Sequence, residues 1–287
     1  MSALSTVERA FVRRLGPLRA DGRRLNEGRK IAVRRGRNLT TGQAQCEVDL
    51  GETRALSQVS ATTAVPHADR ANEGVLRVNV VLSPMARADW DPALARGGSS
   101  AVGKANSYVT TVIEHALLET RAVDLEGLCI VAGRKVWAVQ VDVHILNDGG
   151  NVIDAGVLSA LGALSHFRRP DVSVTGDSVH VFSLEEREPV PLSIHHTPFC
   201  VTFSLFHRSS AEAEADGDDA TRFFLLDPTD REELARDGQI TIIVNSHSEI
   251  CGVHKHGWPP LSSEQISHLV SLAVERVPTL AECIADN

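Results

Sequence analysis

A regular alternation of apolar and polar residues is clearest between positions 136 and 146. Its apolar members are Trp137, Val139, Val141, Val143 and Ile145. Because successive side chains of a strand point to opposite faces, this pattern predicts a long strand with one buried face. Residues 75–82 repeat the pattern, and residues 31–59 repeat it between turn residues, which predicts a further strand and antiparallel hairpins.

Apolar residues at helical spacing predict a short leading helix at about residues 4–19, a helix after residue 106, one at 153–167 and a closing helix at 262–284. Proline and clustered glycines predict a loop over residues 89–106. Shorter strands are predicted at 172–182, 199–206, 223–226 and 240–244. The mixture predicts an α+β fold.

The composition limits the classes of protein that fit. A chain of 287 residues with 43% hydrophobic residues can bury a sizeable core. Aromatic residues make up only 4%, which disfavours RNA binding by base stacking on aromatic rings. The five cysteines are widely spaced and no apolar run reaches membrane-spanning length. We therefore expect a soluble protein of a reducing compartment, without disulfides or a membrane span.

Charge is distributed unevenly around a net value of -8. Basic residues crowd positions 13–37, whereas positions 209–221 are acidic and low in complexity. The basic segment is either a solvated face or a surface for RNA or an acidic partner. The acidic segment carries no large apolar side chain, so we expect a loop insertion within a single domain spanning residues 1–287.

Four segments carry candidate chemistry, and each has a structural alternative. His195-His196 and His254-Lys255-His256 have no carboxylate or cysteine at zinc-ligand spacing, which favours turn and surface histidines over a metal site. Residues 148–151 (DGGN) could cradle a phosphate at a helix start or only turn the chain. Residues 227–233 could hold Mg²⁺ or form an acidic turn that opens a helix.

Residues 19–23 (RADGR) and 51–54 (GETR) form two short motifs near the start of the chain. These motifs resemble the opening of the ribonuclease-PH-like family of exosome subunits. A closer resemblance, to the polymyositis/scleroderma autoantigen type of ring subunit, rests on residues 129–137 (CIVAGRKVW), 142–144 (DVH), 166–174 (HFRRPDVSV) and 191–196 (PLSIHH).

The resemblance implies a ribonuclease-PH-like domain of two similar halves, each like domain 2 of ribosomal protein S5. Six such subunits form a ring with a central RNA channel. The implied partners are other ring subunits of ribonuclease-PH type, S1/KH cap subunits and RNA, with no membrane and no cofactor. The implied locations are the nucleus, the nucleolus and the cytoplasm.

The resemblance also implies a degenerate active site. Active members carry Gly-Gly-Thr-Arg after the long strand, where Thr and Arg hold the attacking phosphate, but this chain has Asn151 and Val152. Their metal and acid positions correspond to Asp227 and Glu233. Without the guanidinium we expect a non-catalytic ring subunit; the alternatives are an active phosphate-dependent 3′-to-5′ exoribonuclease and a free-standing RNA-binding protein. Candidate contacts to RNA phosphates are Arg87, Arg96, Lys104 and Arg134.

Overall fold

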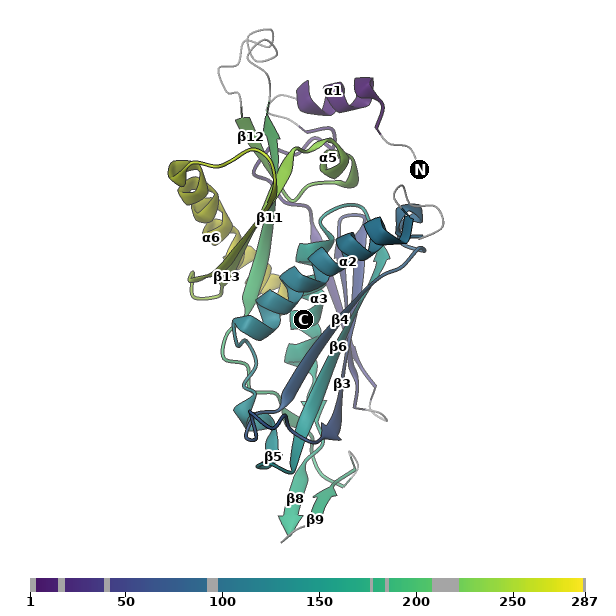
Figure 1. Cartoon of the computed structure of the whole chain (residues 1–287), viewed down its shortest axis with the longest axis vertical. Helices are drawn as coiled ribbons and strands as arrows, with labels where there is room; N and C mark the ends of the chain where they lie inside the picture. The colour runs from purple at the N-terminus through teal and green to yellow at the C-terminus, as the bar shows by residue number, and fades with distance from the viewer. Residues whose placement is uncertain are drawn as a thin grey trace.

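The computed structural model describes residues 4–14, 19–38, 42–91, 98–175, 178–183, 186–207 and 222–285. Figure 1 shows an elongated molecule with two sheets and a buried helix between them. The predicted α+β class is therefore confirmed. Within these residues no helix combines the length and apolar character needed to cross a membrane.

The larger sheet comes from the first half of the chain. Its strands follow the order β1-β2-β3-β6-β4, with β5 paired to β6; they are β1 (Ile31–Arg37), β2 (Ala44–Leu50), β3 (Thr53–Ala64), β4 (Val75–Leu82), β5 (Cys129–Val131) and β6 (Lys135–Asn147). All neighbours are antiparallel except β4 and β6. The predicted hairpins and both predicted longer strands are confirmed.

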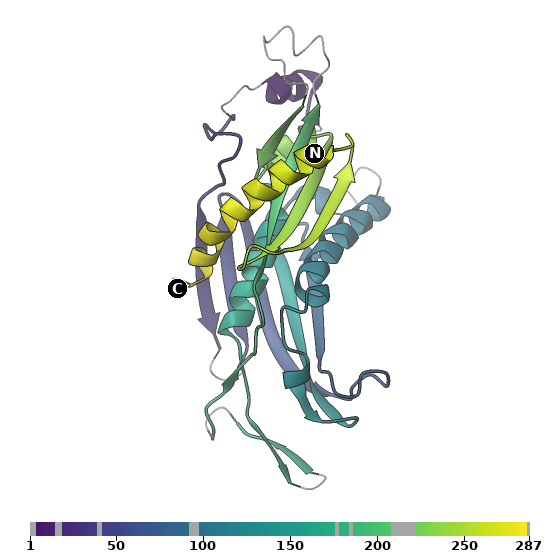
Figure 2. The ribbon, with the colours of Figure 1, turned by 90° about the vertical axis from the view of Figure 1, so that its left-hand side faces the viewer.

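The smaller sheet comes from the second half and has the order β12-β11-β13-β14. Its strands are β11 (Pro198–His207), β12 (Arg222–Leu226), β13 (Gly238–Asn245) and β14 (Ile250–Gly257). Every residue of β13 is buried, because the strand lies between β11 and β14 and α6 (Ser263–Ala285) packs against it. Figure 2 shows α6 running diagonally across this sheet.

Helix α3 (Val152–His166) forms the centre of the core. Its first thirteen residues, through Leu164, are buried, because β2, β3 and β6 pack on one side and β11 and α6 on the other. A helix that is apolar on all sides needs such cover. The hydrophobic core is therefore continuous from the first sheet to the second.

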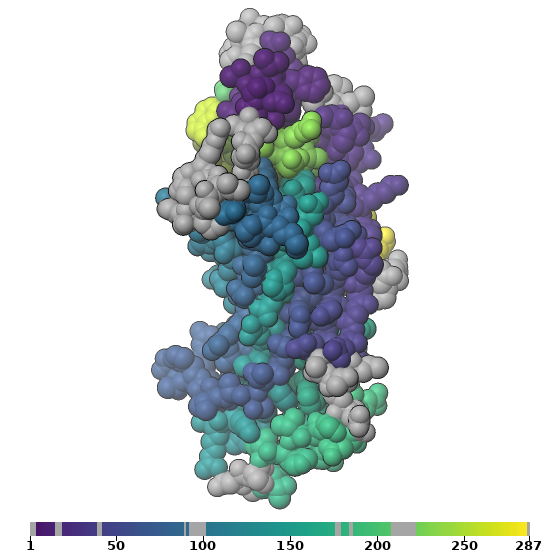
Figure 3. Space-filling model, turned by 90° about the vertical axis from the view of Figure 1, so that its right-hand side faces the viewer, coloured from purple at the N-terminus to yellow at the C-terminus, as the bar shows by residue number. Residues whose placement is uncertain are grey.

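The remaining elements lie at the ends of the molecule. Helix α1 (Thr6–Arg14) packs on the short helix α5 (Asp230–Ala235), which Figure 3 shows in purple over light green. The other elements are η1 (Ala88–Trp90), η2 (His115–Glu119), η3 (Glu126–Leu128), β7 (Arg168–Arg169), β8 (Val172–Thr175), β9 (Ser178–Val181) and β10 (Val190–Pro191). The hairpin β8–β9 projects from the end opposite α1 (Figure 1).

Three expectations about elements were wrong. The loop predicted to end at residue 106 gives way to helix α2 (Gly98–Glu114), because burial of Val109 and Val112 offsets the modest helix penalty of its glycines. The single strand predicted at 172–182 is a hairpin. The segment 250–257, interpreted as a turn with surface histidines, is the edge strand β14. The acidic segment 209–221 lies outside the described residues.

Candidate functional site

Asp227 stands at the point where β12 ends and the chain turns toward α5. Its backbone is in the left-handed region, with φ of 51°, and its carboxylate is buried. Five donors use the two carboxylate oxygens: three from Arg29, one from Asn151 and one from Arg23. Because these donors stabilise the charged form against the cost of burial, the pKa of Asp227 is lowered.

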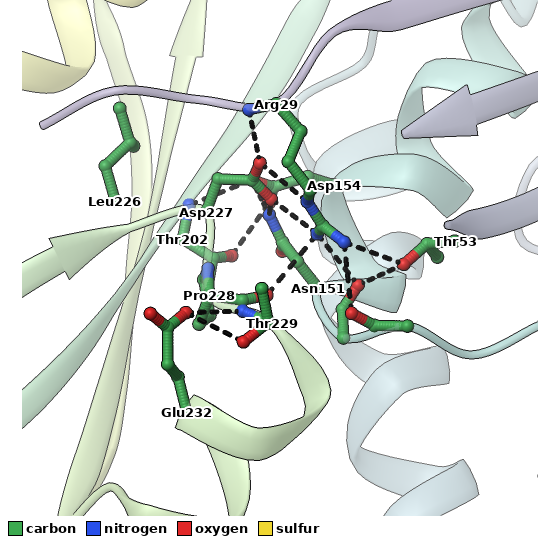
Figure 4. Close-up of polar contacts among 12 residues, drawn as sticks. Arg29, Thr53, Asn151, Asp154, Thr202, Leu226, Asp227, Pro228, Thr229 and Glu232 are labelled. Carbon is green, nitrogen blue, oxygen red and sulfur yellow. Dashed lines mark hydrogen bonds and ion pairs between the residues drawn. The ribbon is translucent and has the colours of Figure 1, made fainter. Parts of the chain in front are cut away.

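Arg29 connects segments of both halves of the chain (Figure 4). Its Nη2 lies 2.7 Å from Asp227 Oδ1, and its Nη1 and Nη2 donate to the carbonyl oxygens of Gly149 and Gly150 at 3.0 Å each. Thr53 Oγ1 accepts a longer bond from Nη1 at 3.3 Å. The guanidinium thus fills the space between the turn after β6 and the loop after β12.

Asn151 links α3 to this cluster. Its φ is 57°, and its side-chain Nδ2 donates to Asp227 Oδ1 and to Asp154 Oδ2 at 2.8 Å each. Asp154 also accepts bonds from the amide and hydroxyl of Thr202 on β11. Burial raises the pKa of Asp154 to about 7 despite these donors. The side-chain amide of Asn151 therefore bonds to two buried carboxylates, those of Asp154 and Asp227.

Val152 is the first residue of α3 and is buried. A cavity of about 300 Å³ opens beside it, and Arg236, Lys104, Asp148 and Glu233 are among its lining residues. Glu233 accepts bonds from the amide of Asn151 at 3.2 Å and from Arg236 at 2.9 Å, so the charge of Arg236 is already offset. Burial raises the pKa of Glu233.

Arg19 of the RADGR segment bonds to the loop that follows β12. Arg19 is 4% exposed and forms a two-pronged ion pair with Glu232, with its Nε 2.8 Å from Oε1. Its Nη1 and Nη2 also donate to the carbonyls of Leu226 and Asp227. Glu232 in turn closes a capping box with Thr229 at the start of α5. This part of the acidic segment 227–233 therefore opens a helix, which confirms its structural interpretation.

The glycine turn at residues 148–151 is packed against protein. A side-chain carbon on Gly150, whose φ is 92°, would lie 2.4 Å from the backbone carbon of Thr229. Asp230 donates its amide to the carbonyl of Gly149 at 3.0 Å. Glycine at position 150 thus permits a close approach of two backbone segments, which is the structural interpretation of the turn.

The four cations expected to contact RNA do not form one patch. Arg87 lies 3.3 Å from Asp148, and the exposed Lys104 lines the cavity beside it. Arg134 lies in the turn before β6, and Asp148 follows the end of that strand, so about 40 Å separates them at the rise of a strand. Arg96 lies outside the described residues.

No group of three or more His, Cys, Asp or Glu side chains in the described chain is arranged to hold a metal ion. Asp227 illustrates why: its oxygens already accept bonds from five donors. The histidine of β14 at position 254 bonds instead to His115 of η2, with their rings perpendicular and 4.6 Å apart. These two histidines are part of a packing contact between elements.

Sequence reasoning located four residues of this site and missed three of its central members. Asn151, Val152, Asp227 and Glu233 all lie at or beside the cluster, and their assignment to a degenerate phosphate and metal site stays a prediction. Arg29, Asp154 and Thr202 were not singled out. The available signal was weak: Arg29 stands within a run of basic residues, and Asp154 is a lone acid in an apolar helix.

Comparison with protein families matches residues 27–170 to domain 1 and residues 196–276 to domain 2 of the 3′ exoribonuclease family, RNase PH. The chain is 40% identical to exosome complex component RRP45 of Bos taurus over 98% of this chain and 59% of that protein. It is 38% identical to RRP45A of Arabidopsis thaliana over 94% of this chain and 81% of that protein. The chain thus spans about three fifths of the bovine relative.

Solved structures have a similar fold. The exosome of Archaeoglobus fulgidus with RNA bound to the active site superposes with a TM-score of 0.76 at 24% identity, covering 96% of this chain and 97% of that one. An archaeal exosome core superposes with a TM-score of 0.74, also at 24% identity, covering 97% and 96%. At this identity the likeness supports the ribonuclease-PH-like fold.

Proposed function

Because this chain belongs to the 3′ exoribonuclease family, and within it to the family of exosome component RRP45, we propose that it is a non-catalytic ring subunit of an RNA exosome. The observation that carries the proposal is the set of hydrogen bonds that the chain's own side chains form with Asp227. Arg29 and Asn151 donate hydrogen bonds to the Asp227 carboxylate, and Val152 presents no charge to the cavity at the start of α3.

Phosphate-dependent cleavage of RNA needs an anion held in place as the nucleophile. A doubly charged phosphate in a partly buried site requires charge-assisted bonds, for which an arginine fork is well suited. Here Arg236 is paired with Glu233, and Arg29 donates to Asp227 and to two carbonyl oxygens. Neither guanidinium is available to hold a phosphate, so the site supports structure rather than chemistry.

Family membership suggests what the chain contributes to an exosome. Its partners would be other ribonuclease-PH-type ring subunits, S1/KH cap subunits and RNA. Arg87, Arg96, Lys104 and Arg134 are the candidate contacts to RNA phosphates, and Arg134 would bind the RNA far from Arg87 and Lys104. We place the protein in the nucleus, the nucleolus and the cytoplasm, as its resemblance implies.

A nuclease assay on the purified chain tests the proposal. Single-stranded RNA incubated with the chain, phosphate and Mg²⁺ should release no nucleoside diphosphates, and the same chain should co-purify with a ring subunit that carries the Gly-Gly-Thr-Arg turn. Phosphate-dependent release that disappears in Glu233→Gln would overturn the non-catalytic assignment. Saturable RNA binding by a chain that remains monomeric with every ring subunit would favour a free-standing RNA-binding protein.

A further inference from the structure

A cluster of basic side chains lies at the end of α3 farthest from Val152. Strand β1 and helix α3 run side by side: Ile31 and Asn151 line one small cavity, and Gly162 lies against Arg35 near the other end. Arg37 is on the same face of β1 as Arg35, and His166 is one helical turn after Gly162. The two side chains are therefore neighbours.

Arg168 and Arg35 complete the cluster. Arg168 follows α3 directly, and its Nη1 donates to the carbonyl oxygens of Ser165 and Phe167 at 3.0 Å each. Arg35 donates to the carbonyl of Ile284 near the end of α6. Figure 2 shows that end of α6 beside β1. Three elements thus bring four basic side chains to one place on the surface.

Three of these four side chains have no carboxylate partner in the part of the chain that the structure describes. Arg37, His166 and Arg168 form no ion pair with a described carboxylate. By contrast, Arg34 on the opposite face of β1 is paired with both Glu47 and Asp49. The positive charge of the arginines, in a chain with a net charge of -8, favours the binding of an anion at this place.

The carbonyl groups at the end of α3 bind only one of these basic side chains, that of Arg168. Carbonyl dipoles at the end of α3 attract cations, and Arg168 uses one nitrogen for them. Arg37 is exposed at the end of β1 and makes no side-chain bond within the described chain. Burial, followed by Arg37, Arg168 and Arg35, lowers the pKa of His166, which is consistent with a positive local field.

We propose that Arg37, His166 and Arg168 form a phosphate-binding surface for RNA, at the opposite end of α3 from the degenerate site. The proposal rests on the proposed role in an RNA exosome and adds a second contact region about 20 Å away, the length of the helix. Guanidinium groups match phosphate oxygens in geometry, and a protein partner would instead need an apolar anchor at the centre of its interface.

The test measures binding of 5′-labelled single-stranded RNA to the full chain by fluorescence anisotropy across a range of salt concentrations. Arg37→Ala combined with Arg168→Ala should weaken binding roughly tenfold at low salt and reduce the slope of log affinity against log salt by about one. Arg77→Ala, which removes an exposed arginine from β4, is the matched control and should change neither quantity.

Two further variants separate the possible outcomes. Arg37→Glu alone, at an exposed position without side-chain bonds in the described chain, should weaken RNA binding without loss of folding, whereas unchanged affinity would overturn the proposal. If replacing Arg87, Arg96, Lys104 and Arg134 together weakens binding but the double variant does not, the second surface fails while the proposed function stands. Binding of polyglutamate in preference to RNA, lost in the double variant, would assign the surface to an acidic protein instead.

Discussion

Arg29 and Asp227 form the buried ion pair on which the site depends. Their side chains are 9% and 6% exposed. Removing one partner of such a pair leaves an uncompensated charge, which costs about 3–5 kcal/mol. We therefore expect Arg29→Met to lower the free energy of unfolding by that amount, measured by urea denaturation at pH 7.

A double variant provides the control for this measurement. Arg29→Met combined with Asp227→Asn removes both charges, so its loss of stability should be smaller than that of Arg29→Met alone. If the loss of stability of the double variant relative to the native chain equals the sum of the losses measured for Arg29→Met and Asp227→Asn separately, the two side chains do not interact as their separation of 2.7 Å indicates.

Asp154 should make stability depend on pH. Its pKa in the folded chain is about 7, above the ordinary value of 3.8, so the folded state binds its proton more tightly than the unfolded state. The stabilisation that protonated Asp154 contributes to the folded state is fully present below 3.8, its pKa in the unfolded chain, and is lost as pH rises through about 7. The stability of the native chain relative to Asp154→Asn should thus fall between pH 5 and pH 8, by an amount on the order of a few kcal/mol.

Thermal or urea unfolding of both chains at matched pH values checks this sign. A stability difference that stays constant across the range would show that Asp154 is charged throughout. The comparison isolates this carboxyl because the other titratable groups are the same in both chains.

At this scale the sequence gives side-chain identities but not the bonds that the side chains form. The apolar character of Val152 is read directly from the sequence. The role of Arg29 depends on a bond to Asp227, 198 positions away, and on two carbonyls that no residue pattern reports. A contact between distant segments becomes visible only once the chain is folded.

Among the elements, η2 and β14 are joined by a pair of histidines. His115 bonds to His254, and a side-chain carbon on Gly252 would lie 2.6 Å from the ring of His115. Burial and the neighbouring His115 lower the pKa of His254. The stabilisation is therefore present above the ordinary pKa of histidine and is lost as pH falls below it.

Hydrogen exchange reports on this contact directly. Amides of β14 should exchange faster at pH 5.5 than at pH 7.5 once the intrinsic pH dependence of exchange is removed, and His254→Gln should abolish that difference. His180, exposed on β9, supplies the matched control in His180→Gln, which should leave the exchange of β14 unchanged. Equal protection of β14 at both pH values would mean that the histidine pair does not hold this strand.

Element prediction succeeded where one pattern covered a whole element. The alternation of β6 and the helical spacing of α3 are long and uninterrupted, and both were placed to within one residue of their bounds. Strand β14 has no such pattern, because it carries glycine and histidine where α2 and η2 pack and forms the edge of its sheet. Its packing depends on partners that its own sequence does not specify.

In the molecule as a whole, α3 packs against both sheets and lies at the centre of their common hydrophobic core. Its burial requires β2, β3 and β6 from the first half and β11 and α6 from the second. We therefore expect residues 1–183 expressed alone to remain unfolded or aggregate, because one face of α3 would be exposed. Circular dichroism and urea titration of this fragment test the prediction that residues 1–287 fold as one domain. A cooperative transition in the fragment would contradict it.

The surroundings of Val152 would not let an arginine at this position bind phosphate. Val152→Arg would place a guanidinium at a position only 8% exposed, beside a cavity already lined by Asp148 and Glu233. These carboxylates would neutralise the new charge, and Arg29 and Asn151 would still occupy Asp227. Isothermal titration of Val152→Arg with inorganic phosphate should therefore show no binding. A phosphate site here would therefore need changes among these neighbouring residues as well as at position 152.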